Sequence, residues 1–526
     1  MKKLKIAFIT NGIYTDKYFY QLAKWVKDND DKFICKDFII IKNKKKQLLN
    51  SKIIKKISFK FLILFERILL FFYTKHKEHF KKFNLKTIIN DSFEIFEIQK
   101  KTQSFFSDKD LDKIKKQNYD IIIRACSNIL TGDILKIPKL GIFSFHHGDI
   151  EKYRGTPAGF WEVFYKNDTT GFIIQKLNEK LDDGKILFKG SFQTKFFFLL
   201  NQAEMYSKSI VYFQKVLNDV HQNKNFNSID CQNVGKVYEL PKIKNQFIYI
   251  LNLFLRILKK FFNRKVFWKI FYYNLKKNSF LIYPNSKNKF LADPFIFKNN
   301  SENYIFAEEY CFRNRKGYIV CIDINKSGNK KTVLKEKFHL SFPYLFEYKN
   351  KIFMCPETSS INEIRLYVSK KFPYEWSYHT TLIKNIKCVD SIIFERDNIW
   401  WLLTNIARDD YNDFGHDLSI FYSVDGPLSS KWIKHHKNPI FVDAKISRNA
   451  GFFKNDRGEI YRVSQKQGFD QYGRGIDFHK ILEISKEKYI EKTENIDLPK
   501  DIIKTFEKNS VHHFSKNSEN IVFDFN

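Results

Sequence analysis

The side chains best suited to chemistry in this sequence gather between residues 141 and 190. His146 and His147 stand next to each other at the end of an apolar run, and Asp182 follows further along the chain. A histidine can relay a proton near neutral pH, and an aspartate within reach can hold the charge state of the imidazole and collect the proton. The spacing places His146 and Asp182 at different strand ends of one sheet, where the sites of parallel α/β folds gather.

The two adjacent histidines are poor joint ligands for a metal ion. Neighbouring residues on a strand point to opposite faces, so His146 and His147 cannot both reach one ion. We therefore expect no metal site at this position.

The landmarks of this segment resemble those of the formyltransferase family, which includes methionyl-tRNA, glycinamide ribonucleotide and sugar N-formyltransferases. In that family an apolar strand leads into G-x-x-N-x-H-x-S-L-L-P-x-x-R-G, which is followed by T-G and L-D-x-G. His146 falls on the family's histidine without gaps. The later landmarks fall on Arg154-Gly155, Thr170-Gly171, Leu181-Asp182 and Gly184. The likeness covers about residues 1–200.

The resemblance implies transfer of a formyl group from a folate donor, 10-formyltetrahydrofolate, to an amine. It assigns the proton transfer to His146 and Asp182. Arg154 is either a turn residue or a contact to an anionic substrate.

Two departures from the family pattern leave the transferred group open. The family's asparagine, which donates a hydrogen bond to the carbonyl oxygen, is Ser144 here, and the S-L-L-P is replaced by residues 148–151. Loss of one such donor can lower turnover by on the order of 10²-fold. Transfer of another group on the same scaffold, or a catalytically idle domain that binds a ligand, are the alternatives.

Apolar runs alternate with helical patterns in the first third of the chain. Strands are predicted over residues 4–10, 38–41, 93–98 and 121–125, and a helix over residues 107–117. This alternation predicts a Rossmann-like α/β domain. The G-x-G-x-x-G turn is missing, so we expect no dinucleotide.

Two segments combine large apolar residues with Lys and Arg. One lies within a proposed insertion at about residues 42–85, and the other covers residues 247–273. Each apolar stretch is shorter than the roughly 20 residues that a membrane span requires. They are either buried helices of a lysine-rich protein or helices that lie in a membrane interface.

From about residue 291 onward, short β-type runs alternate with polar turns. Similar pieces recur roughly every 50 residues, which is the period of propeller blades. Five such units fit the length. They begin near Ala292, Ser341, Val389, Ser447 and Val511.

Three carboxylates stand near the ends of predicted blade strands: Asp293, Glu357 and Asp390. They resemble the acid and base groups of arabinanase-type and fructosidase-type glycosidases. The segments ADPF, FPYLFEYKNKIFMCPE, W-x-x-H-x-x-N-P and SRNAG resemble more closely the non-catalytic propeller of glucosamine inositolphosphorylceramide transferases. That likeness covers residues 265–526, and it implies recognition of a glycan or sugar nucleotide. Hydrolysis and a purely structural role are the alternatives.

The composition supports a folded protein with anionic neighbours. Lys and Arg number 91 against 58 Asp and Glu, a formal net charge of +33, which favours membrane surfaces or phosphorylated substrates. We expect no nucleic-acid partner, because neither an arginine-rich reading helix nor paired zinc-finger cysteines are present. Seven scattered cysteines without a C-x-x-C pair indicate reduced thiols in a cytoplasmic protein.

Together these patterns predict an α/β Rossmann-like formyltransferase domain followed by an all-β five-bladed propeller. The domains are placed at residues 1–205 and 265–526, with a helical linker at 206–264. The expected function is transfer of a formyl or related acyl group to a nucleotide- or lipid-linked amino sugar in surface-glycan biosynthesis, with peripheral contact to the inner face of the membrane. The rivals are a non-catalytic glycan-binding scaffold and a glycosidase.

Overall fold

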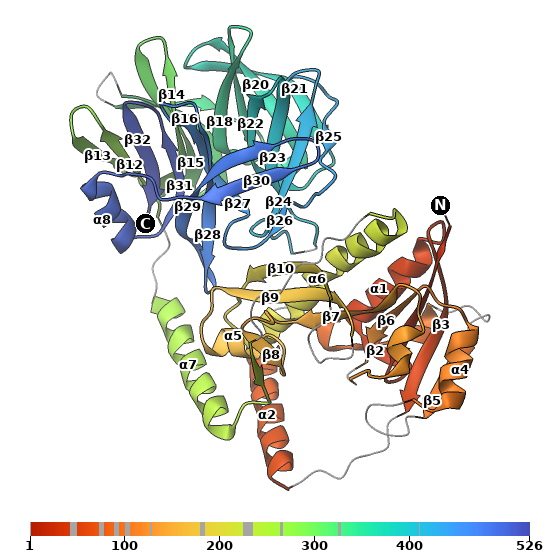
Figure 1. Cartoon of the computed structure of the whole chain (residues 1–526). Helices are drawn as coiled ribbons and strands as arrows, with labels where there is room; N and C mark the ends of the chain where they lie inside the picture. Colours follow the sequence, from red (N-terminus) through yellow and green to blue (C-terminus); the bar gives the residue numbers. More distant parts are fainter. Residues whose placement is uncertain are drawn as a thin grey trace. The chain divides into compact units, whose positions relative to one another are not determined.

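The computed structural model describes residues 2–42, 50–72, 78–88, 94–99, 106–126, 129–178, 185–224, 235–262, 267–324, 328–409 and 411–526. The chain divides into two compact units, residues 1–262 and 263–526 (Figure 1). The first unit is α/β and the second is a five-bladed β-propeller, so the predicted fold class is confirmed.

A seven-stranded sheet forms the frame of the first unit, in the order β10-β9-β7-β6-β1-β3-β5. Strands β7, β6, β1, β3 and β5 run parallel to one another. β9 is antiparallel to both of its neighbours, β7 and β10. The central strands are nearly continuous in apolar residues, as expected where both faces of a sheet are covered. The strands span Leu4–Thr10 (β1), Phe33–Lys42 (β3), Glu94–Gln99 (β5), Ile121–Ala125 (β6), Gly141–His147 (β7), Thr169–Lys176 (β9) and Lys185–Gln193 (β10).

Helices cover both faces of this sheet. α1 contacts α6 over one face, while α4 and the 3₁₀ turn η3 pack on the other. α4 begins where the Ser107 Oγ accepts a hydrogen bond from the Asp110 N–H at 3.3 Å, a typical N-cap. The helices span Lys17–Asp28 (α1), Asp108–Lys116 (α4), Asp133–Lys136 (η3), Phe160–Phe164 (α5) and Phe198–His221 (α6). Short elements of the same unit are Tyr14–Asp16 (β2), Glu78–Phe80 (η1), Lys82–Asn84 (β4), Leu85–Thr87 (η2), Tyr153–Gly155 (β8) and Lys236–Tyr238 (β11).

α6 runs through residue 206, where the sequence analysis places the start of a linker. Tyr212 and Phe213 on this helix are fully buried, and the Tyr212 ring lies 5.6 Å from that of Phe172 on β9. The helix is therefore part of the first unit.

Two further helices, Asn50–Leu69 (α2) and Ile243–Phe262 (α7), contact each other in the first unit. They are joined through Glu66, whose carboxylate is fully buried. It accepts hydrogen bonds from the backbone N–H groups of Phe198 at 3.1 Å and Leu199 at 2.8 Å, at the start of α6. The Tyr249 hydroxyl of α7 also donates to Glu66. A carboxylate at a helix N-terminus satisfies donors that have no partner within the helix.

The second unit contains five blades, four of them four-stranded and one with an additional short strand, and their first strands contact one another in a closed ring. The last blade combines β31 and β32 from the C-terminus with β12 and β13 from the start of the unit. This pairing closes the ring with backbone hydrogen bonds.

The strands span Lys289–Asn299 (β14), Glu302–Cys311 (β15), Lys316–Asp323 (β16) and Asn329–Leu334 (β17) in the first of these blades. The second blade holds Ser341–Tyr348 (β18), Lys351–Glu357 (β19), Glu363–Lys371 (β20) and Glu375–Lys384 (β21). The third holds Cys388–Arg396 (β22), Ile399–Ile406 (β23), Asp417–Ser423 (β24) and Ile433–Lys434 (β25), with Phe441–Val442 (β26) beside β24. The fourth holds Arg448–Lys454 (β27), Ile460–Gly468 (β28), Gln471–Ile484 (β29) and Tyr489–Thr493 (β30). The closing blade holds Lys269–Asn274 (β12), Ser279–Tyr283 (β13), Val511–Lys516 (β31) and Asn520–Phe525 (β32), preceded by Lys500–Lys508 (α8); the 3₁₀ turn Ser359–Ile361 (η4) follows β19.

Each innermost strand carries a register shift near its start. The shifts lie at 292–295, 341–344, 389–392, 449–451 and 511–514. β-bulges redirect side chains and are enriched next to functional sites. The irregularity recurs at the start of the innermost strand in all five blades, over two residues in four of them and over one residue at 449–451.

Candidate active site

A cavity of about 360 Å³ in the first unit lies where β1, β6 and β7 end. The strand order reverses direction between β1 and β6, which is the place where open α/β sheets bind ligands. The volume lies within the range of small-molecule pockets. Its polar lining residues include Asn11, Asp16, Lys82, Arg124, Ser144 and His147.

Ser144, at the position of the family asparagine, is buried between two other polar side chains. The Arg124 guanidinium of β6 donates a hydrogen bond to the Ser144 hydroxyl at 3.2 Å. On the other side, Gln175 of β9 is the cross-strand partner of Ser144. Gln175 is 3% exposed, and its side-chain oxygen has no hydrogen-bond partner among the described residues. A buried amide in this state is suited to receive a ligand donor.

Arg124 and Gln175 were not identified from the sequence. Each is the polar residue in a strand that is otherwise almost wholly apolar, and that contrast was the available signal. A guanidinium and an amide beside Ser144 can stabilise negative charge on a carbonyl oxygen.

His146 and His147 point away from each other, as strand geometry predicts. The His147 Nε2 hydrogen-bonds to the Ser209 hydroxyl of α6 at 3.0 Å, and its ring stacks on Phe145. Burial, with a smaller contribution from His146, lowers the pKa of His147 to about 3, so this ring stays neutral. The His146 Nε2 lies 3.5 Å from the Tyr153 carbonyl oxygen, and its side chain is only half-buried.

Of the residues predicted for this site, Ser144 lines the cavity, whereas His146 is not among the lining residues, although its neighbour His147 is. Asp182 lies outside the described residues. Arg154 lies on β8, which pairs with β11, and is not among the residues that line the cavity. In the loop that replaces S-L-L-P, the Glu151 carboxylate forms an ion pair with the Lys189 ammonium of β10 at 2.8 Å. The Asp149 carboxylate lies 3.9 Å from the same ammonium group.

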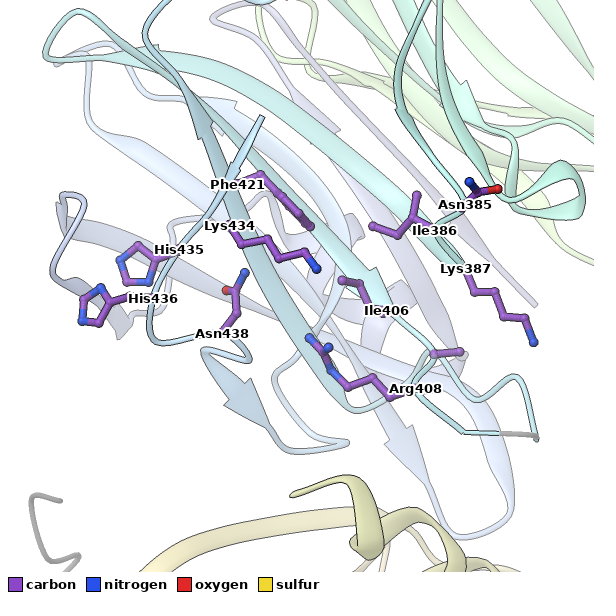
Figure 2. Close-up of a pocket in the computed structure, with 11 residues that line it drawn as sticks. Asn385, Ile386, Lys387, Ile406, Arg408, Phe421, Lys434, His435, His436 and Asn438 are labelled. Carbon is purple, nitrogen blue, oxygen red and sulfur yellow. The ribbon is translucent and has the colours of Figure 1, made fainter. Parts of the chain in front are cut away.

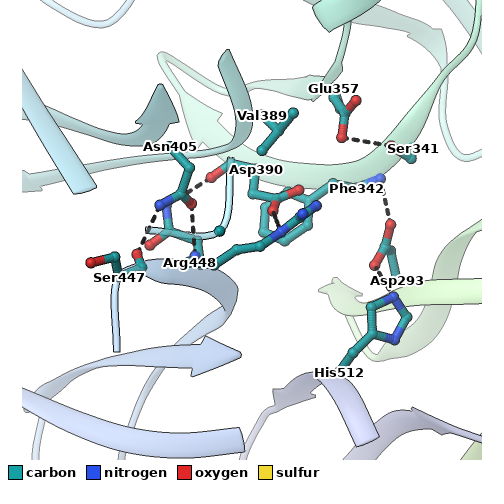
Figure 3. A network of polar contacts seen from close by, with 12 residues as sticks. Asp293, Ser341, Phe342, Glu357, Val389, Asp390, Asn405, Ser447, Arg448 and His512 are labelled. Atoms are coloured by element: carbon teal, nitrogen blue, oxygen red, sulfur yellow. Dashed lines mark hydrogen bonds and ion pairs between the residues drawn. The ribbon is translucent and has the colours of Figure 1, made fainter. Parts of the chain in front are cut away.

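The bulges of the propeller bring a second set of polar groups together at the centre of the ring (Figure 3). Asp293 accepts a hydrogen bond from the Phe342 N–H at 3.2 Å, and Glu357 accepts one from the Ser341 hydroxyl at 3.0 Å. Asp390 accepts one from the Arg448 guanidinium at 2.8 Å. The three carboxylates predicted from the sequence therefore lie in one network.

The carboxyl groups of this network have pKa values that are shifted in opposite directions. Burial raises the pKa of Asp390 to about 7, although Arg448 opposes the shift. Burial would also raise the pKa of Asp293, but its bond to His512 lowers the value to about 2. Buried Glu308, next to these carboxylates, has a pKa well above its ordinary value. At neutral pH the centre therefore holds carboxyl groups of both protonation states.

His512 was missed by sequence analysis, and it supplies the balancing charge. Its Nδ1 lies 2.7 Å from Asp524 and its Nε2 lies 3.3 Å from Asp293. These carboxylates outweigh the effect of burial and raise the pKa of His512 to about 10. The three residues also have the spacing of a metal-ligand set.

An aromatic side chain borders the centre of the ring. The Arg448 guanidinium lies 5.0 Å from the centroid of the Tyr472 ring, and Tyr472 is 46% exposed. In contrast, Tyr367, Trp400 and Trp401 are buried in the blade cores. An exposed ring beside a polar centre is a suitable platform for a sugar.

A second cavity of the propeller, of about 630 Å³, is basic (Figure 2). Its lining includes Lys387, Arg408 and Lys434. Two residues of the W-x-x-H-x-x-N-P segment also line it, but they have structural roles. His435 hydrogen-bonds to the Ser485 carbonyl at 3.0 Å. The Asn438 amide accepts a hydrogen bond from the Ile420 N–H and donates one to the Ile420 carbonyl.

Comparison with known proteins gives a different match for each unit. Residues 68–195 match the family model described as formyl transferase, and residues 280–519 match that of the N-terminal part of glucosamine inositolphosphorylceramide transferase 1. Both resemblances predicted from the sequence are confirmed.

Individual relatives follow the same division. Glucosamine inositolphosphorylceramide transferase 1 of Arabidopsis thaliana is 35% identical over 214 residues, 39% of this chain and 27% of that protein. The enzyme of the same name from Oryza sativa subsp. japonica is 32% identical over 220 residues, 41% of this chain and 29% of that protein. A methionyl-tRNA formyltransferase of Clostridioides difficile is 38% identical over 80 residues, 15% of this chain and 26% of that protein. The chain thus spans less than a third of the length of these relatives.

Proposed function

We propose that the protein transfers a formyl group from 10-formyltetrahydrofolate to the amino group of a nucleotide- or lipid-linked sugar during surface-glycan synthesis. The observation that carries this proposal is the cavity at the ends of β1, β6 and β7, which is lined by Arg124 and Ser144 on a chain with the family motif.

The reaction forms a bond between the amine nitrogen and the formyl carbon and breaks the bond from that carbon to the folate nitrogen. The folate supplies the activated formyl group. His146 relays the proton that the amine loses, and Asp182 is proposed to collect it, as the family resemblance implies. The folate nitrogen takes up a proton as its bond to the formyl carbon breaks, so tetrahydrofolate leaves as the neutral amine. Arg124 donates to the carbonyl oxygen, which gains negative charge during attack, in place of the family's asparagine.

The test is release of tetrahydrofolate from 10-formyltetrahydrofolate in the presence of a panel of nucleotide-linked amino sugars. His146→Ala should abolish the release, while His379→Ala, an exposed histidine of β21, should leave it unchanged. No release from any acceptor, together with no folate binding by calorimetry, would contradict the proposal. Release of another acyl group would favour the alternative transferase.

For the propeller we propose recognition of the sugar at the centre of the ring, beside Tyr472. The separated pKa values of Asp293 and Asp390 favour a second candidate, hydrolysis of a glycosidic bond, because a hydrolase needs one carboxylate and one carboxylic acid. The two are distinguished by Asp293→Asn. This change should abolish glycan cleavage if the centre hydrolyses glycosidic bonds. Tyr472→Ala should weaken sugar binding whether the centre only recognises the sugar or also cleaves it.

A further inference from the structure

The outer surfaces of α2 and α7 expose an unusual number of large apolar side chains. On α2 these residues recur at helical spacing, and Phe61 and Ile68 are 66% and 65% exposed. They lie on the side of the helix opposite Phe59 and Leu62, which are buried. The stripe comprises Ile54, Ile57, Phe61, Leu64 and Ile68.

α7 repeats this arrangement. Phe247 and Phe254 are 68% and 57% exposed, whereas Tyr249 and Leu253 on the opposite side are buried. The exposed stripe comprises Ile243, Phe247, Leu251, Phe254 and Leu258. Contiguous apolar surface of this kind marks an interaction site.

The inner sides of the two helices pack against the same residue. Phe59 of α2 and Tyr249 of α7 pack on one residue, Phe160 of α5, with ring centroids 5.8 and 5.2 Å away. The helices also touch directly, because the Gln246 amide donates to the Lys55 carbonyl at 3.4 Å. Figure 1 shows them side by side. Since both bury their inner sides against the same cluster, their outer sides form one surface, which we call the α2/α7 face.

The charges around this face identify its partner. Within the two helices the only acidic residue is Glu66, which is buried. The basic residues are numerous, and Lys56, Lys60 and Lys259 are exposed. Glu239, which precedes α7, is exposed and pairs with Lys55 of α2 at 3.6 Å, so one acidic charge beside the face is already matched. A face of protruding Phe, Leu and Ile with lysines and no exposed acid within the two helices is complementary to an anionic lipid surface. No helix among the described residues is long and apolar enough to cross a membrane.

We propose that the α2/α7 face inserts into the interfacial layer of an anionic phospholipid bilayer and holds the first unit at the membrane surface. Phe and Ile side chains enter the acyl boundary, and the lysines remain among the headgroups. This inference does not depend on formyl transfer.

Co-sedimentation of the full chain with phospholipid vesicles tests the proposal. Vesicles containing about one third phosphatidylglycerol should bind the protein, pure phosphatidylcholine vesicles should bind it weakly, and salt should reduce binding to the anionic vesicles. Combining Phe61→Ser, Ile68→Ser, Phe247→Ser and Phe254→Ser should lower partitioning at least about 100-fold. Lys56→Glu, Lys60→Glu and Lys259→Glu together should lower it by about 100-fold or more.

The matched control is Val424→Ser with Ile433→Ser, two exposed apolar residues of the propeller, which should bind as the wild type does. The proposal is overturned if the wild type does not co-sediment with anionic vesicles, or if the four serine changes leave vesicle binding unchanged. It is also overturned if light scattering shows a dimer that the serine changes dissociate while no vesicle binding occurs, since a second copy would then cover the face. Circular dichroism confirms that each variant is folded.

Discussion

Arg124 is a charged side chain in the apolar strand IIIRA, and it contacts the residue that departs from the formyltransferase pattern. A serine hydroxyl at position 144 is shorter than an asparagine amide and free to rotate, so alone it is a poor donor to a carbonyl oxygen. The guanidinium at 3.2 Å supplies a fixed, always charged donor at the same place. We therefore propose that Arg124 supplies the donor that the family's asparagine provides.

Arg124→Met should lower kcat for formyl transfer by about 10²-fold and change KM little, because the bond to the oxygen strengthens only in the transition state. Lys139→Met, which removes an exposed cation of the same unit, should have no effect. Steady-state kinetics with the best acceptor of the panel measures both. Ser144→Asn, added to Arg124→Met, should recover part of the activity; wild-type kcat in Arg124→Met would exclude this role.

The sequence indicated only those residues of this site that lie close together in the chain. Ser144 was recognisable because it belongs to a contiguous motif, whereas His146 of the same motif is not among the residues that line the cavity. Gln175 and Arg124 belong to other strands, and only the register of β6, β7 and β9 places them beside Ser144. In the propeller, Asp293 and Asp390 were recognisable by residue type, whereas His512 occupies an equivalent bulge with a different residue.

At the scale of elements, Glu66 connects α2, α6 and α7. Glu66→Ala leaves two N–H groups at the start of α6 and the Tyr249 hydroxyl without their acceptor. Buried donors left unpaired cost about 1–3 kcal/mol each, so the free energy of unfolding of the first unit should fall by about 3 kcal/mol. Urea denaturation followed by tryptophan fluorescence measures the change, and Glu78→Ala, at an exposed ion pair, is the control. An unchanged midpoint for Glu66→Ala would show that α2 docks without this carboxylate.

Sequence patterns predicted the bounds of strands and helices better than they predicted which sides of the helices are buried. The strands predicted over residues 4–10 and 121–125 have the observed bounds, and α4 falls within the predicted helix at 107–117. Burial in α2 and α7 could not be read in the same way, since apolar residues occupy both the inner and the outer sides of each helix. Only the packing around Phe160 shows which side is left exposed.

At the scale of the whole molecule, the propeller depends on the strands that close its ring. β12 pairs with β32 along their length, and His512 on β31 lies between Asp524 of β32 and Asp293 of the neighbouring blade. The ion pairs therefore join the closing blade to the next one. Their contribution to stability must follow the protonation of His512, whose pKa is raised to about 10.

The sign of that dependence gives the last prediction. A histidine whose pKa rises on folding stabilises the fold fully below its unfolded value of about 6.5, and the contribution is lost as the pH rises toward 10. Asp293, with its pKa lowered to about 2, contributes above about pH 4 and loses this contribution only in strong acid. The melting temperature of the propeller should therefore fall between pH 7 and 10, and His512→Gln should start lower and fall less steeply. Calorimetry at several pH values, with His379→Gln as the matched control, measures the two slopes. Parallel slopes for His512→Gln and the wild type would mean that the imidazolium does not hold the ring closed.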